Sequence, residues 1–245
     1  MKSNLIRKIS MMACILLGFV QHPLAQGTLI LGHFGSANPT NEGFSLFTYG
    51  ASSLTPVMND YGYNAWSIGV SSPNAVAEYY QSLTSEQSDA LSDGWVLSLT
   101  LRVVQPCNPV YSGIEAGFGG AGVGLDFGAL SDGDPAVWLE NTLTEYDFNG
   151  GGSGYHNYQL RYDAPTGLVS LWVDGTEWLN DIPINSNDVG PDLEVVWGEN
   201  QSASIYANWS EVSLWATPEP SGISLFLLGG GVLICVRRRK QAVRC

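Results

Sequence analysis

One short segment restricts the fold of this chain more than any other, the hairpin phrase between Tyr155 and Leu179. Apolar and polar residues alternate in Tyr158–Tyr162, and after a turn containing Pro and Gly three branched apolar residues fall on one face of Leu168–Asp174. The pair Asp174-Gly175 is typical of a two-residue hairpin turn, in which both central residues need positive φ. The segment therefore predicts three antiparallel strands in a meander.

The rest of the chain between its two ends also consists of short strand-like runs separated by turn residues. Short apolar or alternating runs are separated by Gly, Pro, Asn, Asp and Ser, and no strand–helix–strand rhythm appears. This pattern predicts an all-β antiparallel sandwich or barrel, and residues 27–216 are a suitable length for one such domain. The predicted strands are Leu29–Phe34, Phe44–Tyr49, Ala65–Val70, Trp95–Val104, Ile114–Phe118, Gly122–Phe127, Ala136–Glu140, Tyr155–Asp163, Leu168–Asp174, Glu194–Gly198 and Ser210–Ala216.

One short helix is predicted within this β-rich region. The run Thr84-Ser85-Glu86-Gln87 has the pattern of a capping box, in which a Thr side chain and a Gln side chain three residues later each accept a backbone N–H of the other residue. Ala90 and Leu91 continue the helical stretch, and Gly94 ends it.

The hairpin phrase resembles the concanavalin A-like lectin/glucanase superfamily, particularly its laminin-G-like modules. In those modules a phrase of the form Tyr-x-Leu-x-Tyr-Asp, a turn, and Gly-x-x-x-Leu-x-Val-Asp-Gly recurs, and here it reads Tyr158–Asp163 and then Gly167–Gly175. The segment Asn208–Leu214, which follows Val196–Gly198, is similar to the final strand pair of such domains. The resemblance implies a jelly-roll sandwich of two antiparallel sheets over residues 27–216.

The basic residues of the chain lie almost entirely at its two ends. Between Gly27 and Ala216 there are 22 acidic residues against only two basic ones, Arg102 and Arg161, so this region carries a net charge of −20. Such a surface repels phosphate backbones, which argues against nucleic acid as a partner. The excess of carboxylates is compatible with divalent cations, but acidity by itself also keeps an exported protein soluble.

Residues 1–26 have the pattern of a secretory signal peptide. A basic start ending at Lys8 precedes the apolar run Ile9–Val20, and cleavage is expected near Ala25 or Gln26. The alternative is an N-terminal membrane anchor, but this run rises only about 18 Å as a helix, against about 30 Å for a bilayer core. We therefore expect a cleaved signal and export through the Sec translocon.

Residues 217–245 combine three features in a fixed order: a Pro-Glu-Pro motif, an apolar run and a basic cluster. The basic cluster stays on the cytoplasmic side by the positive-inside rule, so the preceding domain faces outward. The apolar run rises about 26 Å as a helix, and three successive glycines in its middle make it a weak permanent anchor. The residues of the motif and the cluster are Pro218, Glu219, Pro220, Arg237, Arg238, Arg239 and Lys240.

This tail resembles the PEP-CTERM sorting signal, in which a Pro-Glu-Pro motif precedes a short membrane helix and an arginine cluster. The resemblance implies that an exosortase, a membrane-embedded cysteine transpeptidase of bacteria that secrete exopolysaccharide, recognises the motif and removes the tail. The precursor would then be held in the inner membrane by the short transmembrane helix, and the mature domain would reach the cell envelope or the medium. The alternative is an ordinary single-pass anchor preceded by a chance Pro-Glu-Pro sequence.

Catalytic patterns are incomplete in this sequence. Glycoside hydrolases of the superfamily use two carboxylates, carried in a Glu-x-Asp-x-x-Glu pattern on one strand, and the nearest match, Glu145–Gly150, lacks the final Glu. No Gly-x-Ser-x-Gly elbow presents a serine, and the one thiol of residues 27–216, Cys107, lies in a proline-flanked turn without a base nearby in sequence. We therefore expect no enzymatic activity.

Calcium is the one metal for which the sequence offers ligands. Asp132 and Asp134 flank a glycine and provide hard oxygen ligands of the type that calcium prefers. The alternative is a plain turn, because Asp and Gly favour turns for backbone reasons alone. The histidines of the domain, His33 and His156, are too far apart in sequence to match a zinc-ligand spacing.

Tryptophan is the residue that suggests a ligand. We expect most of these side chains to lie in the core of the sandwich, but Trp172 alternates with the apolar residues of its strand and is predicted on the opposite face, where it could contact a sugar. The expected function is an exported, non-enzymatic protein that binds glycan or exopolysaccharide matrix. The alternatives are a glycoside hydrolase of the same fold and a purely structural matrix protein. The tryptophans of the domain are Trp66, Trp95, Trp138, Trp172, Trp178, Trp197, Trp209 and Trp215.

The sorting interpretation predicts the fate of a tail variant. Replacing Pro218, Glu219 and Pro220 together by alanine removes the motif that the exosortase would read, so an uncleaved precursor should accumulate in the membrane fraction of a host that carries an exosortase. Immunoblotting of membrane and released fractions measures the two forms. Unchanged release of the mature domain would contradict the sorting interpretation.

Overall fold

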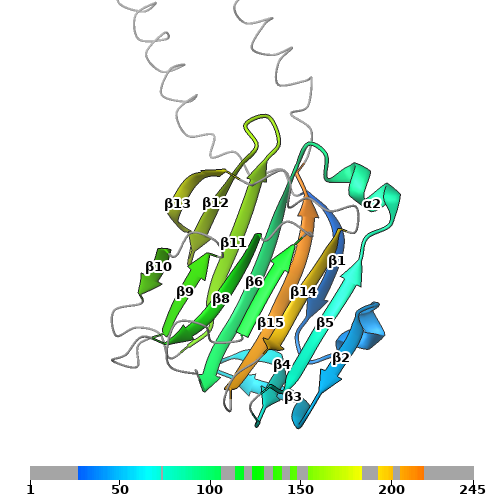
Figure 1. Ribbon diagram of the computed structural model, residues 1–245, viewed down its shortest axis with the longest axis vertical. Helices are drawn as coiled ribbons and strands as arrows, with labels where there is room; N and C mark the ends of the chain where they lie inside the picture. The colour runs from blue at the N-terminus through cyan, green and yellow to red at the C-terminus, as the bar shows by residue number, and fades with distance from the viewer. Residues whose placement is uncertain are drawn as a thin grey trace, which may run out of the picture. The chain divides into compact units, whose positions relative to one another are not determined.

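Two antiparallel β-sheets lie one over the other (Figure 1). Buried side chains from both sheets form the core. The computed structural model describes residues 27–72, 74–105, 114–118, 123–129, 135–139, 144–147, 154–183, 193–200 and 205–217. The described elements, in chain order, are β1 (Thr28–Phe34), the 3-10 helix η1 (Pro39–Glu42), β2 (Ser45–Tyr49), β3 (Ser52–Asp60), β4 (Tyr63–Val70), β5 (Val76–Ser82), α2 (Ser85–Ala90), β6 (Gly94–Gln105), β7 (Ile114–Phe118), β8 (Val123–Ala129), β9 (Pro135–Leu139), β10 (Thr144–Asp147), β11 (His156–Asp163), β12 (Leu168–Val173), β13 (Thr176–Pro183), β14 (Glu194–Asn200) and β15 (Ile205–Ala216).

The larger sheet is organised around its two longest strands, β6 and β15. Its order is β13-β12-β11-β6-β15-β4-β3, and β15 pairs along one side with β6 and along the other with β4 at its start and with β1 at its end. The smaller sheet has the order β10-β9-β8-β7-β14-β5-β2. All of the described pairings are antiparallel, which confirms the predicted two-sheet sandwich.

The hairpin phrase forms the meander that its sequence predicts. β11 pairs with β12, and β12 pairs with β13, in register with the predicted turns. Asp174 and Gly175 have φ values of 49° and 77°, as the two-residue turn requires. The three apolar residues Val169, Leu171 and Val173 are buried in the core. The meander forms one end of the larger sheet.

The predicted helix is also confirmed. Thr84 caps α2: its hydroxyl accepts the backbone N–H of Gln87, and the Gln87 side chain accepts the backbone N–H of Thr84. The Gln87 amide in addition donates to the backbone carbonyl of Ile30, which ties the helix to β1.

Some strands were not predicted, for reasons visible in their surroundings. β3 is an edge strand whose side chains are exposed or half-buried, and it contains Pro56, a residue that sheets accept at their edges. β5 was missed because Tyr80 follows the buried Tyr79 and obscures its alternation. β10 is short, and β15 begins at Ile205 instead of Ser210.

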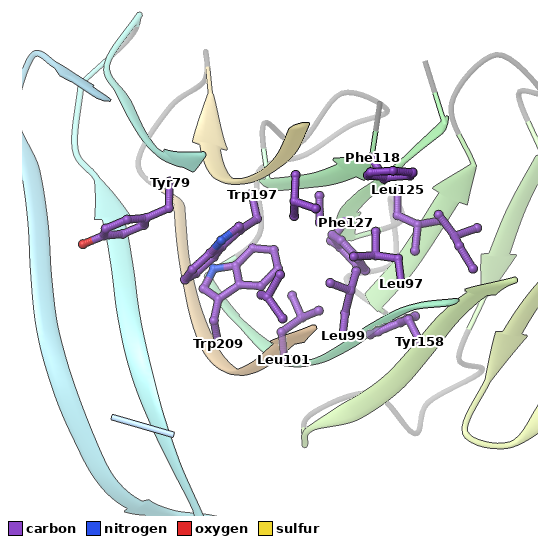
Figure 2. Packing of buried hydrophobic residues seen from close by; sticks show 14 of the residues in the cluster. Tyr79, Leu97, Leu99, Leu101, Phe118, Leu125, Phe127, Tyr158, Trp197 and Trp209 are labelled. Atoms are coloured by element: carbon purple, nitrogen blue, oxygen red, sulfur yellow. The ribbon is translucent and has the colours of Figure 1, made fainter. Parts of the chain in front are cut away.

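Aromatic side chains form the centre of the described core. Trp197 from the smaller sheet lies against Trp209 from the larger sheet with ring centroids 5.2 Å apart, and both are fully buried (Figure 2). Tyr79 and His33 each stack on Trp197, at 5.0 Å and 5.2 Å, and Phe44 meets it edge-on. Aromatic burial on this scale supplies much of the apolar area of a sandwich, so most of the tryptophans serve the core, as expected.

Glu199 is a buried carboxyl group that joins the two sheets. It lies on β14 of the smaller sheet, and its Oε1 accepts the backbone N–H of Ala207 on β15 at 2.7 Å. Ala207 stands at a register shift of β15 against β6, the kind of position where an amide loses its partner in the ladder. Glu199 supplies an acceptor to this amide from the opposite sheet.

Burial sets the charge state of this group. It raises the pKa of Glu199 to about 9, although the backbone hydrogen bonds lower it in part. The Oε2 atom has no hydrogen-bond partner among the described residues, so no donor there stabilises the charged form.

The raised pKa predicts how stability depends on pH. Between the unfolded-state pKa near 4.5 and the folded-state value near 9, unfolding releases a proton, so stability falls as the pH rises, by at most about 1.4 kcal/mol per pH unit. Glu199→Gln keeps an accepting oxygen and does not titrate, so its unfolding free energy should lack this fall.

Chemical denaturation of the wild type and the variant at several values between pH 5 and pH 8 measures the difference. Glu194→Gln on the same strand, at a half-buried position, is the matched control and should follow the wild type. Parallel pH profiles for the wild type and Glu199→Gln would contradict the assignment.

Candidate functional site

The outward side of the larger sheet is polar, in contrast to its inward side. On β6 the residues Leu97, Leu99 and Leu101 face the core, so Ser98 and Thr100 between them lie on the outward side. The same alternation holds on the neighbouring strands. We call the resulting surface the polar face, and it consists of Ser98, Thr100, Asn157, Gln159, Arg161, Ser170, Trp172, Glu211, Ser213 and Trp215.

Strand register places these side chains in rows across the sheet. One row runs from Trp172 on β12 through Gln159 on β11 and Ser98 on β6 to Ser213 on β15. Ser98 and Ser213, the two hydroxyl residues of the row, are buried. A polar strip with an aromatic residue at one end therefore crosses four strands.

Hydrogen bonds run along β15 from Trp215 to Glu211 and then across the sheet to Thr100 and Asn157. The Trp215 indole donates to the Ser213 hydroxyl at 2.8 Å, and that hydroxyl donates to Glu211 Oε1 at 2.6 Å. Thr100 makes a longer contact of 3.5 Å to the other oxygen of Glu211, and the Asn157 amide donates to Thr100 at 3.2 Å. This network holds the polar side chains in defined positions, which lowers the entropic cost of binding a ligand.

Trp172 lies on the polar face, where the sequence placed it. It is half-buried, its indole N–H donates to the Ser170 hydroxyl at 3.3 Å, and the Arg161 guanidinium lies over its ring at 4.2 Å from the centroid. Arg161 also donates from Nε and from Nη2 to Gln159 Oε1, at 3.2 Å and 2.6 Å. An indole, a guanidinium and an amide are thereby stacked and bonded into one group.

A second polar cluster pins the turn between β3 and β4 to the sheet. Asp60 accepts hydrogen bonds from Arg102 Nη1 at 2.8 Å and 2.9 Å, from the Tyr155 hydroxyl at 3.0 Å and from the Asn208 amide at 2.8 Å. Burial alone would raise the pKa of Asp60, but these hydrogen bonds and the Arg102 charge outweigh it and lower the pKa. The carboxylate is fully engaged, so this cluster has a structural role.

The turn that Asp60 holds is conformationally strained. Asn59 and Tyr61, on either side of it, have φ values of 56° and 52°, which L-residues with bulky side chains rarely adopt. The exposed ring of Tyr61 lies under the Arg102 guanidinium at 4.6 Å. Sequence reasoning missed this cluster, because its members come from strands that are far apart in the chain.

The other predicted sites have different outcomes. The calcium candidates Asp132 and Asp134, the thiol Cys107, the signal peptide 1–26 and the sorting residues in 218–245 lie outside the described residues. In the part of the chain that the structure describes, no three His, Cys, Asp or Glu residues are grouped to hold a metal ion. Among the same residues, no helix is both long and apolar enough to cross a bilayer.

The histidines are each engaged within the fold. His33 is fully buried and bonds through Nδ1 to Glu42 at 2.5 Å, and His156 bonds to Asp174 at 2.7 Å. They belong to different strands and have different carboxylate partners. Neither arrangement presents a nucleophile next to a base.

Comparison with known proteins identifies the fold. No protein-family model matches the chain, and no curated protein matches it in sequence. Solved structures do match. The binding domain of botulinum neurotoxin DC in complex with rat synaptotagmin II has a TM-score of 0.54 at 12% identity, and the match covers 83% of this chain and 51% of that chain. A botulinum neurotoxin type C structure has a TM-score of 0.51 at 13% identity, with coverages of 82% and 51%.

A third match has a different coverage. A carbohydrate esterase of the Shiga toxin-encoding bacteriophage phi24B has a TM-score of 0.53 at 12% identity, and the match covers 78% of this chain and 100% of that chain. The present chain thus spans about half the length of the toxin chains. At these identities the likeness shows a jelly-roll-like β-sandwich and nothing of its chemistry.

The Asp60 cluster predicts a stability effect. Asp60→Ala leaves the Arg102, Tyr155 and Asn208 donors without their common acceptor, so the unfolding free energy should fall by about 2 kcal/mol at pH 7. Asp89→Ala, at an exposed position of α2, is the control and should change it by less than about 0.5 kcal/mol.

The pH dependence of the unfolding free energy gives a second comparison of the wild type with Asp60→Ala. Because the folded-state pKa of Asp60 is lowered, its stabilisation is present above the usual value of 3.8 and is lost as the pH falls through the lower folded-state value. Urea titrations should therefore show the gap between wild type and Asp60→Ala closing in acid. A gap that is absent at pH 7 would contradict the role of the cluster.

Proposed function

We propose that this protein is exported, is sorted by an exosortase through its C-terminal tail, and binds glycan of an extracellular matrix on the polar face without turning it over. The observation that carries the binding part is the polar face itself. It places a half-buried indole, a guanidinium and several amide and hydroxyl groups on the solvent side of a rigid sheet.

The chemistry of this surface is suited to a sugar. Sugar rings have an apolar side that packs on an indole and a rim of hydroxyl groups that both donate and accept hydrogen bonds. Trp172 supplies the ring, while Gln159, Asn157 and Glu211 supply donors and acceptors close by. A face with many alternating donors and acceptors is compatible with several sugars, so it favours a repeating polymer over one small molecule.

Two further observations support the proposal. Cell entry of botulinum neurotoxin type C, one of the structural neighbours, depends on interaction with two ganglioside molecules, and the phage neighbour is a carbohydrate esterase. The fold is therefore used in proteins that handle carbohydrate. The two ends of the sequence resemble a signal peptide and a sorting tail, which would bring the domain to an exopolysaccharide.

The lack of a complete catalytic pattern supports a binding role over hydrolysis. The carboxylate of the polar face is engaged in hydrogen bonds within the sheet, as Glu211 bonds to Ser213. A purely structural role in the matrix is the other outcome that the binding experiment can return.

The experiment uses residues 28–217, a compact unit that contains the entire described core. A panel of neutral and acidic polysaccharides is tested for retention by affinity electrophoresis and for released reducing ends. We expect retention of at least one polysaccharide without turnover, and about a tenfold or greater loss of affinity for Trp172→Ala.

Phe47→Ala is the matched control. Phe47 is an exposed aromatic residue on β2 of the other sheet, and its loss should leave retention unchanged. Release of reducing ends would show a hydrolase, and failure to retain any polysaccharide would show a structural protein; either result contradicts the proposal.

A further inference from the structure

The two arginines of the folded region lie on the larger sheet in different electrostatic states. Arg102 on β6 is bonded to both oxygens of the Asp60 carboxylate. Arg161 on β11 has no carboxylate within ion-pair distance among the described residues. Arg161 is therefore the one arginine of residues 27–216 that keeps its charge without an anionic partner in the described structure.

The guanidinium of Arg161 is held in place from two directions. Its Nε and Nη2 atoms both donate to Gln159 Oε1, so that one edge of the group is used, and its central carbon lies over the Trp172 ring at 4.2 Å. The other edge, formed by Nη1 and the second Nη2 hydrogen, has no acceptor among the described residues. A guanidinium edge of this type matches the two oxygens of a carboxylate.

The electrostatic surroundings keep Arg161 cationic. Burial lowers the pKa of Arg161, and the nearby carboxylate of Glu177 partly offsets the shift, so the group stays cationic at any ordinary pH. Glu177 stands opposite Trp172 on β13 but forms no ion pair with Arg161 in the described structure. A bound anion would complete the pairing that the fold leaves open.

The kind of anion follows from the neighbours and from the total charge. The open edge of the guanidinium is accompanied by an indole, an amide and a hydroxyl, which are groups suited to a sugar ring and its hydroxyls. The region carries 22 acidic residues against two arginines, so a densely charged polyanion would be repelled. A sugar chain with single carboxylates spaced by hydroxyl-rich rings meets both conditions.

We propose that Arg161 recognises the carboxylate of a hexuronate residue in an acidic polysaccharide, with Gln159 and Trp172 holding the guanidinium in the binding orientation. This inference rests on the proposed glycan-binding function and narrows it to one substrate class. Trp172 then has two roles, because it contacts the sugar ring and fixes the plane of the cation.

The experiment uses the full chain in mild detergent and matched pairs of oligosaccharides. Fragments of hyaluronan and of unsulfated chondroitin, which carry one carboxylate on every second ring, are compared with their carboxyl-reduced forms, in which a hydroxymethyl group replaces each carboxylate. In about 0.15 M salt, where long-range repulsion is screened, calorimetry should show at least one acidic fragment binding about tenfold tighter than its reduced form.

Arg161→Gln should reduce this preference to about twofold or less, while Arg161→Lys, which keeps the charge and loses the planar edge, should fall between the two. Arg102→Gln makes the same change in net charge on the same sheet and should keep the preference for the acidic fragment. Circular dichroism of each variant checks that the sandwich is intact.

The outcomes separate this inference from the proposed function. If the reduced fragments bind as well as the acidic ones, or if Arg161→Gln keeps the preference, the role of Arg161 is wrong while glycan binding stands. If neither acidic nor reduced fragments bind the wild-type protein and the wider polysaccharide panel is also not retained, both fall.

Discussion

The alternation of side chains along β6, and along β15 on each side of its register shift between Trp209 and Glu211, is the constraint on which the rest of this structure depends. Each strand sends one set of residues into the core and the other set to the solvent side of the larger sheet. On β6 the register that places the leucines between the sheets therefore also places the hydroxyl residues on the polar face. A shift of one residue in register would bury the polar set and expose the apolar one.

The core is held at its centre by contacts that cross between the sheets. Trp197 and Trp209 meet from opposite sheets (Figure 2). Glu199 accepts the backbone N–H of Ala207 on β15 from the smaller sheet. Burying a carboxyl group is costly, and the protein limits this cost by keeping the group neutral and bonded. Because these contacts between the sheets hold the sandwich together, the outward side can consist of polar residues that contribute little to packing.

The sequence alone predicted the parts of the fold that follow local rules. The hairpin at Asp174, the capping box at Thr84 and most strands follow from alternation, turn residues and caps that act over a few positions. The edge strand β3 was missed because its side chains are exposed or half-buried and carry no pattern of core contacts. Edge strands are specified by their neighbours more than by their own residues.

In the candidate site, too, some features follow from local sequence and others depend on how the strands pair. Alternation was enough to put Trp172 on the outward face, because this depends on its own strand. Its stacking with Arg161 and the bonding of Asp60 to Arg102 and Asn208 depend on strand register and on a strained turn, which bring together residues far apart in the chain. Such contacts become visible only when the pairing of every strand is known.

The most direct test of the account is to map a bound sugar onto the two sheets. Amide and indole chemical shifts of the isotope-labelled domain are followed by NMR during titration with a polysaccharide fragment that it retains. The account predicts shifts concentrated on β6, β11, β12 and β15, including the Trp172 indole. Shifts confined to the outward side of the smaller sheet, around β2 and β5, would contradict it.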